Sequence, residues 1–339
     1  MDGKQISSKV SIIVPAFNRS QFLPNAIKSI TQQNYQNLEI IVIDDGSTDD
    51  TASVMERMIQ QFPFLKYYSN ECAKGPAGAR NTGLRKATGD FLAFLDSDDV
   101  WLENHLKPGI TILHQYPEIN VLFGNFKIYD YHSNKQTSEF FKEKRQLFKL
   151  KSEKINDDLV ILRDDLFKTL IQDNFFHLGS VIIRMKNMEG IQFNEKIFFA
   201  EDRDFAIRLF KEKQATFAYR REPLFILYEH ESNLSAGDLN SHYLFLKSHQ
   251  VLFKEYLEKY YLNYQEKSIL KKRIRNSAIG LAYNFRKRKK FKKSFSTIFS
   301  SMKYGFCFKQ IIELGKVIYA STIGSLHLEF SKLEVPTSI

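Results

Sequence analysis

The chain has 339 residues, 43% of them hydrophobic and 14% aromatic, a composition that excludes a disordered protein and allows one large domain or two smaller ones. Cys72 and Cys307 lie outside any CxxC or Cys/His cluster, which disfavours a disulfide framework or a structural zinc site. The sequence shows no signal-peptide pattern and no apolar run of about 18 residues, so we expect a cytoplasmic chain with no transmembrane helix. The formal net charge is +10, concentrated between residues 241 and 303, where 16 Lys/Arg accompany 3 Asp/Glu.

Short apolar runs alternate with helical patterns over the first part of the chain. The predicted strands cover residues 10–14, 38–43, 65–69, 91–95 and 121–129. The predicted helices cover residues 21–33, 49–62, 75–87 and 103–116, with Ser20 as the cap of the first and Thr48 or Asp49 as the cap of the second. Strands that alternate with helices in this way predict a mostly parallel α/β sheet with helices on both faces.

The pattern weakens between residues 130 and 173, where charged residues dominate and we expect a mobile lid of loop and short helices. Beyond it we expect a strand at 179–185, a helix at 201–213 and strands at 216–219 and 224–228. From about residue 241, apolar residues at helical spacing predict helices to about residue 328. The chain therefore divides into an α/β domain, residues 1–240, and a basic, amphipathic helical region, residues 241–339.

Three acidic clusters lie at ends of the predicted elements. Asp-Asp at 44–45 and Asp-Ser-Asp-Asp at 96–99 each follow a buried strand, and Glu-Asp at 201–202 opens a helix. Because ligands of a parallel sheet bind beyond the carboxyl ends of its strands, the first two clusters are expected at one rim. Taken alone, each of the first two clusters is equally well interpreted as a solvated turn or a helix cap, and Glu201-Asp202 is better interpreted as the acidic residues that are common at a helix start.

Carboxylates at this rim suit a substrate that carries a nucleoside diphosphate. A leaving diphosphate needs its charge neutralised, and a divalent cation held by hard carboxylate oxygens does this. Of Asp96 and Asp98, one can bind such a cation while the other orients it or holds a ribose. A carboxylate at 44–45 can accept the N3 proton of a uracil, with Phe17 facing the same base. Asp202, at a helix start whose dipole favours its ionised form, suits a general base.

The order of five motifs adds a resemblance to a known family. The motifs are Pro-Ala-Phe-Asn, Asp-Asp-Gly-Ser-Thr-Asp, Gly-x-x-x-Ala-Arg-Asn-x-Gly, Leu-Asp-Ser-Asp-Asp and Glu-Asp, and they span residues 10–234. This order resembles the inverting glycosyltransferase family 2. The resemblance implies the GT-A fold, with a nucleotide-binding half at 1–100 and an acceptor half at 101–240, and a divalent cation, Mn²⁺ or Mg²⁺, as cofactor.

The resemblance also implies roles for single residues. The donor-binding residues would be Pro15, Phe17, Asp44, Arg80 and Asp96. Asp98 and His230 would hold the metal, Asp202 would be the catalytic base, and Asp45 and Glu201 would support them.

We therefore expect a metal-dependent enzyme that moves a sugar from a nucleotide-diphosphate sugar, a UDP-sugar, to an acceptor hydroxyl in surface polysaccharide or glycan synthesis. One alternative is a sugar-nucleotide nucleotidyltransferase, which residues 15–19 disfavour because they are not a Gly-rich phosphate loop. The other is a non-catalytic nucleotide-sugar-binding or membrane scaffold protein, which the presence of both Asp98 and Asp202 disfavours. His177 could reach the acceptor side, although a packed histidine is the simpler interpretation.

Residues 285–293 form a basic segment, with seven Lys/Arg in the eight positions from 286 to 293 and phenylalanines interleaved. It is interpreted either as a solvated loop between helices or as a contact with an anionic membrane surface. The membrane interpretation is favoured, because a lipid-linked saccharide acceptor would place the enzyme peripherally at the inner face of the cell membrane. Nucleic acid is the least favoured partner.

Overall fold

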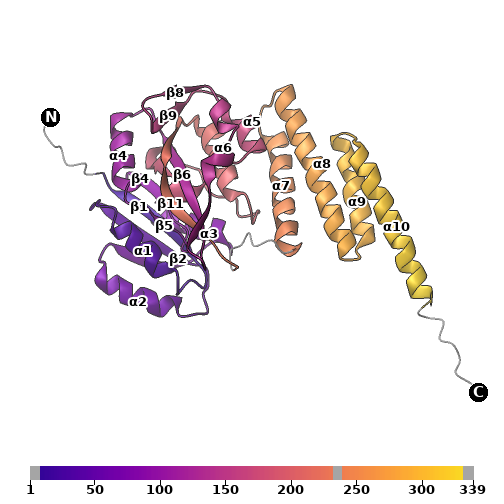
Figure 1. Ribbon diagram of the computed structural model, residues 1–339, viewed down its shortest axis with the longest axis horizontal. Helices are drawn as coiled ribbons and strands as arrows, with labels where there is room; N and C mark the ends of the chain where they lie inside the picture. Colours follow the sequence, from indigo (N-terminus) through magenta and orange to yellow (C-terminus); the bar gives the residue numbers. More distant parts are fainter. Residues whose placement is uncertain (1–7, 232–238, 331–339) are drawn as a thin grey trace, which may run out of the picture. The chain divides into compact units, whose positions relative to one another are not determined.

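The computed structural model describes residues 8–231 and 239–330. It divides into two compact units, residues 1–233 and 234–339, which are described separately. The first unit contains an 11-stranded mixed sheet, and the second contains helices (Figure 1).

The first half of the sheet is parallel, in the order β3-β2-β1-β4. Its strands are β1 (Val10–Ala16), β2 (Leu38–Asp44), β3 (Leu65–Ser69) and β4 (Phe91–Phe94). The helices that connect them are α1 (Leu23–Thr31), α2 (Thr51–Gln61) and α3 (Pro76–Lys86). Strands β1, β2 and β4 are almost entirely buried, as expected when helices cover both faces, whereas β3 at the edge of the sheet is mostly half-buried.

The second half of the sheet is joined to the first by β10 (Ile182–Arg184), which runs antiparallel to both β4 and β6. Beyond β10 the order continues β6-β11-β9-β8, with β5 on β11 and β7 on β6. The bounds are β5 (Val100–Trp101), β6 (Val121–Asp130), β7 (Lys135–Glu139), β8 (Ser152–Lys154), β9 (Leu159–Leu162) and β11 (Phe217–Glu229). The helices of this half are α4 (Leu106–Gln115), α5 (Leu166–Gln172) and α6 (Glu201–Lys213).

Helices flank the sheet (Figure 1), and apolar side chains pack between the helices and both of its faces. On one face, α1, α2 and α4 pack side chains such as Ile27, Met55 and Ile110 against the strands. On the other face, Ala79 of α3 packs on Ile41 and Ile43, and the ring of Phe205 on α6 meets that of Phe94. The helices therefore fix the strand ends from both sides, which is what an accurate site at the sheet edge requires.

Three local expectations are wrong. Ser20 does not cap α1, which begins at Leu23, and its hydroxyl instead donates to Asp49 at 2.7 Å. Neither Thr48 nor Asp49 is the N-cap of α2; that position is Asp50, although Asp49 accepts a bond from the backbone N–H of Thr51. The two strands expected at 216–219 and 224–228 are one long strand, β11, which continues through two irregularities around Pro223.

The loop and short helices expected at 130–173 are found only in part, because this segment contains the short helix α5 but also the strands β7, β8 and β9, which were not predicted. The role of the segment as a lid stays a prediction. Strand β9 is a buried apolar run that pairs with β11. Strands β7 and β8 are largely exposed and polar, so they carry no apolar alternation from which a strand could be predicted.

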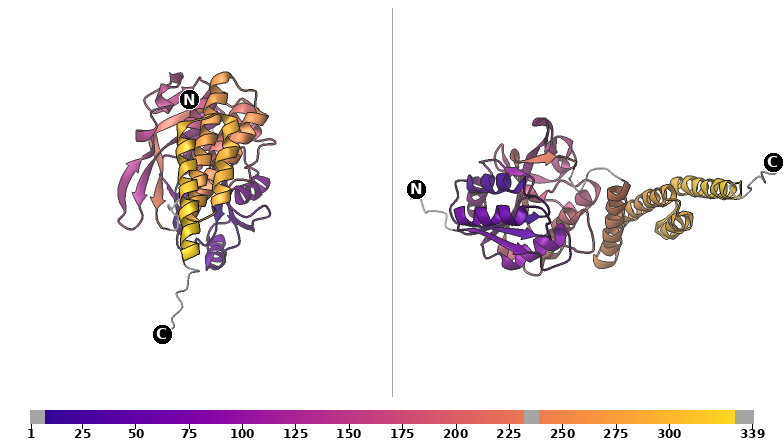
Figure 2. Two further views of the ribbon diagram at one scale, coloured as in Figure 1. Left: turned by 90° about the vertical axis from the view of Figure 1, so that its right-hand side faces the viewer. Right: turned by 90° about the horizontal axis from the view of Figure 1, so that it is seen from below.

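The second unit contains α7 (Leu239–Lys259), α8 (Tyr264–Lys287), α9 (Phe291–Ser301) and α10 (Phe308–Phe330). Figure 2 shows α8, α9 and α10 running side by side. Ala282, Ile298 and Val317 form a small core among these three helices. Within the described parts of the chain, no helix is both long and apolar enough to cross a membrane. The expected helical C-terminal region is confirmed.

Candidate active site

The carboxyl ends of β1 and β2 lie side by side at one edge of the sheet. Ala16 is opposite Asp44, and the backbone N–H of Asp45 donates to the Ala16 carbonyl at 2.8 Å. The loops that follow are bonded to each other, since Asn18 N–H donates to the Ser47 hydroxyl and Thr48 N–H donates to the Asn18 side chain. This mutual bonding gives the edge a defined shape without any ligand.

Asp44 and Asp45 have different surroundings. The Asp44 carboxylate accepts hydrogen bonds from Ser47 N–H at 2.9 Å, from the Ser47 hydroxyl at 2.6 Å and from the Tyr67 hydroxyl at 2.6 Å. Burial and the neighbouring Asp44 raise the pKa of Tyr67 far above its usual value, so its hydroxyl stays a donor. Asp45 accepts from Asn70 and from the backbone N–H of Gly75, and so anchors the turn before α3.

Phe17 is exposed at the end of β1, with 42% of its surface accessible. The ammonium group of Lys74 lies 4.8 Å from the centre of its ring. Pro15 is half-buried in β1 beside β2. An exposed ring beside a held carboxylate, Asp44, offers the two contacts that a planar base needs.

Arg80 connects two of the acidic clusters. Its buried guanidinium donates to Asp96 at 2.6 Å and to Glu201 at 2.9 Å. Although burial opposes the charged form, the carboxylates of Asp96 and Glu201 raise the pKa of Arg80, so it remains cationic. Burial raises the pKa of Glu201, an effect that the Arg80 charge opposes. The three side chains therefore hold the end of β4 against the start of α6.

Asp98 lies between two basic groups. Its carboxylate is 3.2 Å from Nε2 of His230 and 3.4 Å from the guanidinium of Arg19. Burial opposes the charged form, but the hydrogen bond from His230 and the charge of Arg19 lower the pKa of Asp98. The His230 ring stacks on Phe22, with centroids 4.7 Å apart and planes inclined by 14°. Asp98 is therefore an ionised carboxylate held in one place.

Asp99 differs from its neighbour. It is buried, and it accepts one hydrogen bond, at 3.2 Å, from the backbone N–H of Tyr228. Burial and the charges of Asp98 and Asp96 raise the pKa of Asp99 well above its usual range. It is bonded to β11 and does not cap the following helix, as the alternative interpretation of this cluster supposed.

The chemistry of these side chains allows a test of the implied divalent cation. Asp98 and His230 supply one carboxylate and one imidazole within hydrogen-bonding distance of each other. Among the residues that the structure describes, no group of three or more His, Cys, Asp or Glu could hold a metal by itself. Mg²⁺-type sites commonly combine one or two carboxylates with substrate phosphates. The residues therefore fit a cation that binds together with a diphosphate, rather than a permanent metal centre.

Asp202 lies in the first turn of α6, next to Glu201. Its carboxylate accepts a hydrogen bond of 2.8 Å from the side chain of Asn174, which the sequence analysis did not identify. Ala200, immediately before, has φ of +65°, a left-handed conformation that is costly for alanine. The helix therefore starts abruptly, and Asp202 is oriented both by its backbone and by Asn174.

His177 is a packed side chain, as the simpler interpretation predicted. Its ring lies against Phe126 and Phe225, and its Nδ1 accepts from Gly179 N–H at 3.2 Å. Burial lowers the pKa of His177, and the charges of nearby groups, including Asp96 and Asp202, oppose this effect.

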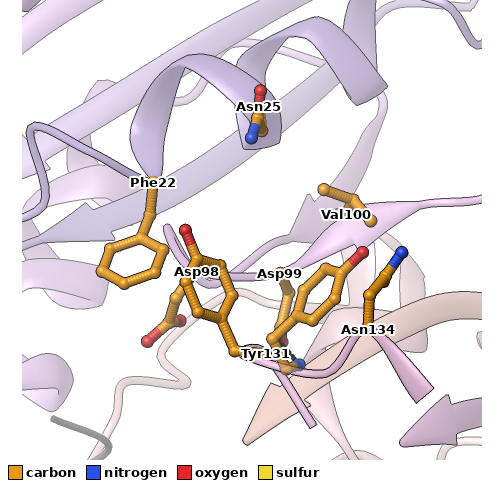
Figure 3. Close-up of a pocket in the computed structure, with 8 residues that line it drawn as sticks. Phe22, Asn25, Asp98, Asp99, Val100, Tyr131 and Asn134 are labelled. Atoms are coloured by element: carbon orange, nitrogen blue, oxygen red, sulfur yellow. Dashed lines mark hydrogen bonds between the residues drawn. The ribbon is translucent and has the colours of Figure 1, made fainter. Parts of the chain in front are cut away.

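A pocket of about 410 Å³ lies beside Asp98 (Figure 3). Phe22 is the N-cap of α1, Asn25 lies in α1, and Tyr131 and Asn134 come from the turn between β6 and β7. The other lining residues are Asp98, Asp99, Val100 and Tyr228. Aromatic rings, two side-chain amides and a carboxylate pair are groups that bind polar, ring-shaped ligands. The sequence analysis did not identify Phe22, Asn25 or Asn134 as site residues.

Comparison with known proteins gives consistent results. The family described as "Glycosyl transferase family 2" matches residues 11–170. A GalNAc(5)-diNAcBac-PP-undecaprenol beta-1,3-glucosyltransferase of Campylobacter jejuni is 30% identical over 240 residues, which are 70% of this chain and 71% of that protein. The UDP-Glc:alpha-D-GlcNAc-diphosphoundecaprenol beta-1,3-glucosyltransferase WfgD of Escherichia coli is 42% identical over 120 residues, which are 35% of this chain and 46% of that protein.

Solved structures support the fold. A crystal structure of S. aureus TarS 1-349 in complex with UDP-GlcNAc aligns with 93% of this chain and 92% of its own, with a TM-score of 0.63 and 19% identity. The mannosyltransferase PcManGT from Pyrobaculum calidifontis, in complex with GDP-Man and Mn²⁺, aligns with 94% of this chain and 87% of its own, with a TM-score of 0.53 and 16% identity. The expected GT-A fold with a helical C-terminal region is confirmed.

Proposed function

The chain belongs to glycosyltransferase family 2 and is a glycosyltransferase, and from this premise we propose that it transfers a sugar, with inversion, from a UDP-sugar to a hydroxyl of a lipid-linked saccharide. The observation that carries the proposal is the pair of bonds from Arg80 to Asp96 and Glu201. Through them the donor-side carboxylates and Asp202 belong to one site, as a displacement between a donor and an acceptor requires.

In this proposal the nucleotide binds at the ends of β1 and β2. The oxygens of Asp44 accept the N3 proton of uracil, and the ring of Phe17, with Pro15 behind it, covers one face of the base. Asp96, which is held by its ion pair with Arg80, faces the ribose. A uridine donor is supported by WfgD, a UDP-Glc glucosyltransferase by name, and by the TarS structure, which is a complex with UDP-GlcNAc.

Asp98 and His230 would hold a divalent cation together with the donor diphosphate. When bound, Mn²⁺ or Mg²⁺ would neutralise the charge that develops on the departing diphosphate. The His230 ring is stacked on Phe22, and its contact with Asp98 orients that carboxylate. Mn²⁺ in the PcManGT complex supports this assignment.

Asp202 would be the general base. Its carboxylate would take the proton of the acceptor hydroxyl as that oxygen attacks the anomeric carbon, while the bond to the diphosphate breaks on the opposite side. Its Oδ2 accepts the 2.8 Å bond from Asn174, and its Oδ1 accepts a 2.7 Å bond from the backbone N–H of Arg203. Asp202 is therefore positioned rather than mobile.

A lipid-linked saccharide is the proposed acceptor, because both relatives carry undecaprenol or diphosphoundecaprenol in their names. The enzyme would then work in surface polysaccharide or glycan synthesis, peripherally at the inner face of the cell membrane. The pocket beside Asp98 has side chains suited to a sugar ring, including Tyr131 and Asn134.

The test is a panel of nucleotide sugars, each supplied with Mn²⁺ or Mg²⁺, with donor hydrolysis and transfer to a lipid-linked saccharide measured separately. Wild-type protein should hydrolyse a UDP-sugar slowly and transfer it faster. Asp98→Ala should lose both activities. Asp202→Asn should lose transfer by roughly 100-fold or more while its donor affinity is kept.

Asp157→Asn is the matched control, because this carboxylate is fully exposed on a loop away from the site residues. Unchanged transfer in Asp202→Asn would overturn its role as base. Formation of a nucleotide sugar from a sugar phosphate and a nucleoside triphosphate would favour the nucleotidyltransferase alternative. Donor binding without hydrolysis or transfer to any acceptor would favour the scaffold alternative.

A further inference from the structure

The second unit exposes an unusual number of large apolar side chains on α9, on α10 and on the link between them. They are Phe295 and Phe299 on α9, Phe306 in the link, and Phe308, Ile311, Ile312, Ile318 and Tyr319 on α10. Phe308 and Tyr319 are 73% and 70% accessible. Scattered apolar residues are normal on a surface, but a grouped set marks an interaction site. We call this set the apolar face.

The residues of the apolar face on α10 lie on one side of the helix. Phe308, Ile311, Ile312 and Tyr319 recur at helical spacing, with Gly315 between them. The opposite side of α10 is buried within the unit and includes Gln310, Glu313 and Val317. The helix therefore buries polar Gln310 and Glu313 beside Val317, while most of its large aromatic and aliphatic side chains face outward.

The same part of the unit is strongly basic. From Arg286 to Lys316 there are ten Lys/Arg and one Asp/Glu. That single acid, Glu313, is buried and already pairs with Arg286 at 3.0 Å and with Lys316 at 3.9 Å. On α9, Lys292 lies next to the row formed by Phe291, Phe295 and Phe299.

We propose that the apolar face of α9 and α10 inserts into the headgroup region of an anionic lipid membrane, with the surrounding lysines and arginines binding the lipid phosphates. Interfacial helices bury apolar side chains at the boundary of the acyl chains and place Lys and Arg at the headgroups. No spanning helix is needed for this, and none is found among the described residues.

The charge argues for lipid and against a second copy of the chain as the occupant. A symmetric dimer through this face would bring one basic segment against another, with Glu313 buried on both sides. An anionic membrane supplies the missing negative charge and an apolar phase together. Exposed Ile311 and Ile312 would gain nothing from a nucleic acid backbone.

In the structure, the proposed membrane contact is centred on the apolar face and not on the basic segment 285–293. The basic segment 285–293 covers the end of α8, the turn after it and the start of α9. In the sequence, its charge and the phenylalanines interleaved with it suggested a membrane contact. The apolar face, by contrast, extends to Tyr319, so that α10 carries more of the contact than the basic segment does.

The test is flotation of the full chain with vesicles of phosphatidylcholine alone or mixed with phosphatidylglycerol, at low and high salt. We expect binding to the mixed vesicles that weakens with salt. Lys292→Gln with Lys293→Gln should weaken it about fivefold for each lysine removed. Phe308→Gln and Tyr319→Gln should each weaken it on the order of tenfold.

Tyr261→Gln is the control, because this side chain is fully exposed in the same unit but outside the apolar face. Its binding should equal that of wild type. No binding of the full chain at low salt, or binding that Phe308→Gln and Tyr319→Gln leave unchanged, would overturn the proposal. So would a concentration-dependent dimer, seen by analytical ultracentrifugation without vesicles and abolished by Phe308→Gln. None of these measurements involves the reaction, so they stand or fall separately from the proposed chemistry.

Discussion

The guanidinium of Arg80 donates a hydrogen bond of 2.9 Å to Glu201, 121 residues further along the chain. The same guanidinium binds Asp96 at 2.6 Å, so a single cation connects the end of β4 with the start of α6. A buried charge of this kind is costly unless each partner is present. The connection therefore makes the geometry of the site depend on the fold as a whole.

The first prediction follows from this arrangement. Arg80→Met leaves two carboxylates close together without their cation, and should lower the free energy of unfolding by about 3–5 kcal/mol. Glu201→Gln in the same chain should recover part of this loss, because one uncompensated charge is removed. Urea unfolding of the single and double variants measures both effects. Arg85→Met, on the exposed side of the same helix, should change stability by less than about 0.5 kcal/mol.

A second prediction concerns Asn174, which donates to Asp202 at 2.8 Å. We expect it to be a positioning residue, so that Asn174→Leu lowers kcat for transfer about tenfold while the donor KM stays the same. Donor hydrolysis, in which water replaces the acceptor, should fall less. A proportional rise in donor KM would instead indicate that the substitution disturbs the nucleotide end of the site.

Much of the first half of the fold could be predicted, because β1, β2 and β4 are largely apolar runs that end in recognisable turns. The acidic clusters could be placed at one rim for the same reason. Asn174 could not be found, since a lone asparagine between two elements carries no pattern. Strands β7 and β8 were missed because exposed polar strands lack alternation, and only their partners β6 and β9 define them.

Glu39 illustrates the same limit and gives a third prediction. It lies in the apolar run of β2, yet its buried carboxylate binds Lys66 at 2.7 Å and Ser11 at 2.7 Å. Burial opposes ionisation, but these bonds and those from Thr88 lower the pKa of Glu39 well below its usual range. Its contribution to stability is therefore present above the unfolded pKa, about 4.3, and is lost as the pH falls.

Glu39→Gln should lower the free energy of unfolding by about 1–3 kcal/mol at pH 7, and its stability should depend less on pH below about pH 5. Thermal unfolding over roughly pH 3 to pH 7 measures both effects. Glu56→Gln, on the exposed side of α2, is the control and should follow wild type. A variant that loses stability equally at every pH would mean that packing, not charge, is what Glu39 contributes.

The fourth prediction concerns the pocket beside Asp98. Asn25 is exposed on α1 and lines this pocket, so Asn25→Ala should leave the helix intact and remove only a hydrogen-bonding group. If a saccharide binds there, the acceptor KM should rise about tenfold, because one hydrogen bond to the acceptor is lost. Donor hydrolysis should be unchanged. Gln60→Ala on α2 makes the same kind of change outside the pocket and should have no effect. An unchanged acceptor KM in Asn25→Ala would remove this residue from the acceptor site.

The last prediction concerns the recognition of the uracil base by Asp44. Asp44 is held by Ser47 and Tyr67, so its carboxylate has a fixed direction before any nucleotide binds. Asp44→Asn would present an amide where a uracil N3–H needs an acceptor, and the dissociation constant for UDP should rise about tenfold or more. Tyr67→Phe keeps the carboxylate but removes one of its supports, so a smaller rise is expected. Calorimetric titration with UDP and with GDP separates base reading from diphosphate binding. An equal loss for both nucleotides would assign Asp44 to the general shape of the loop, because a residue that reads uracil must change the affinity for UDP more than that for GDP.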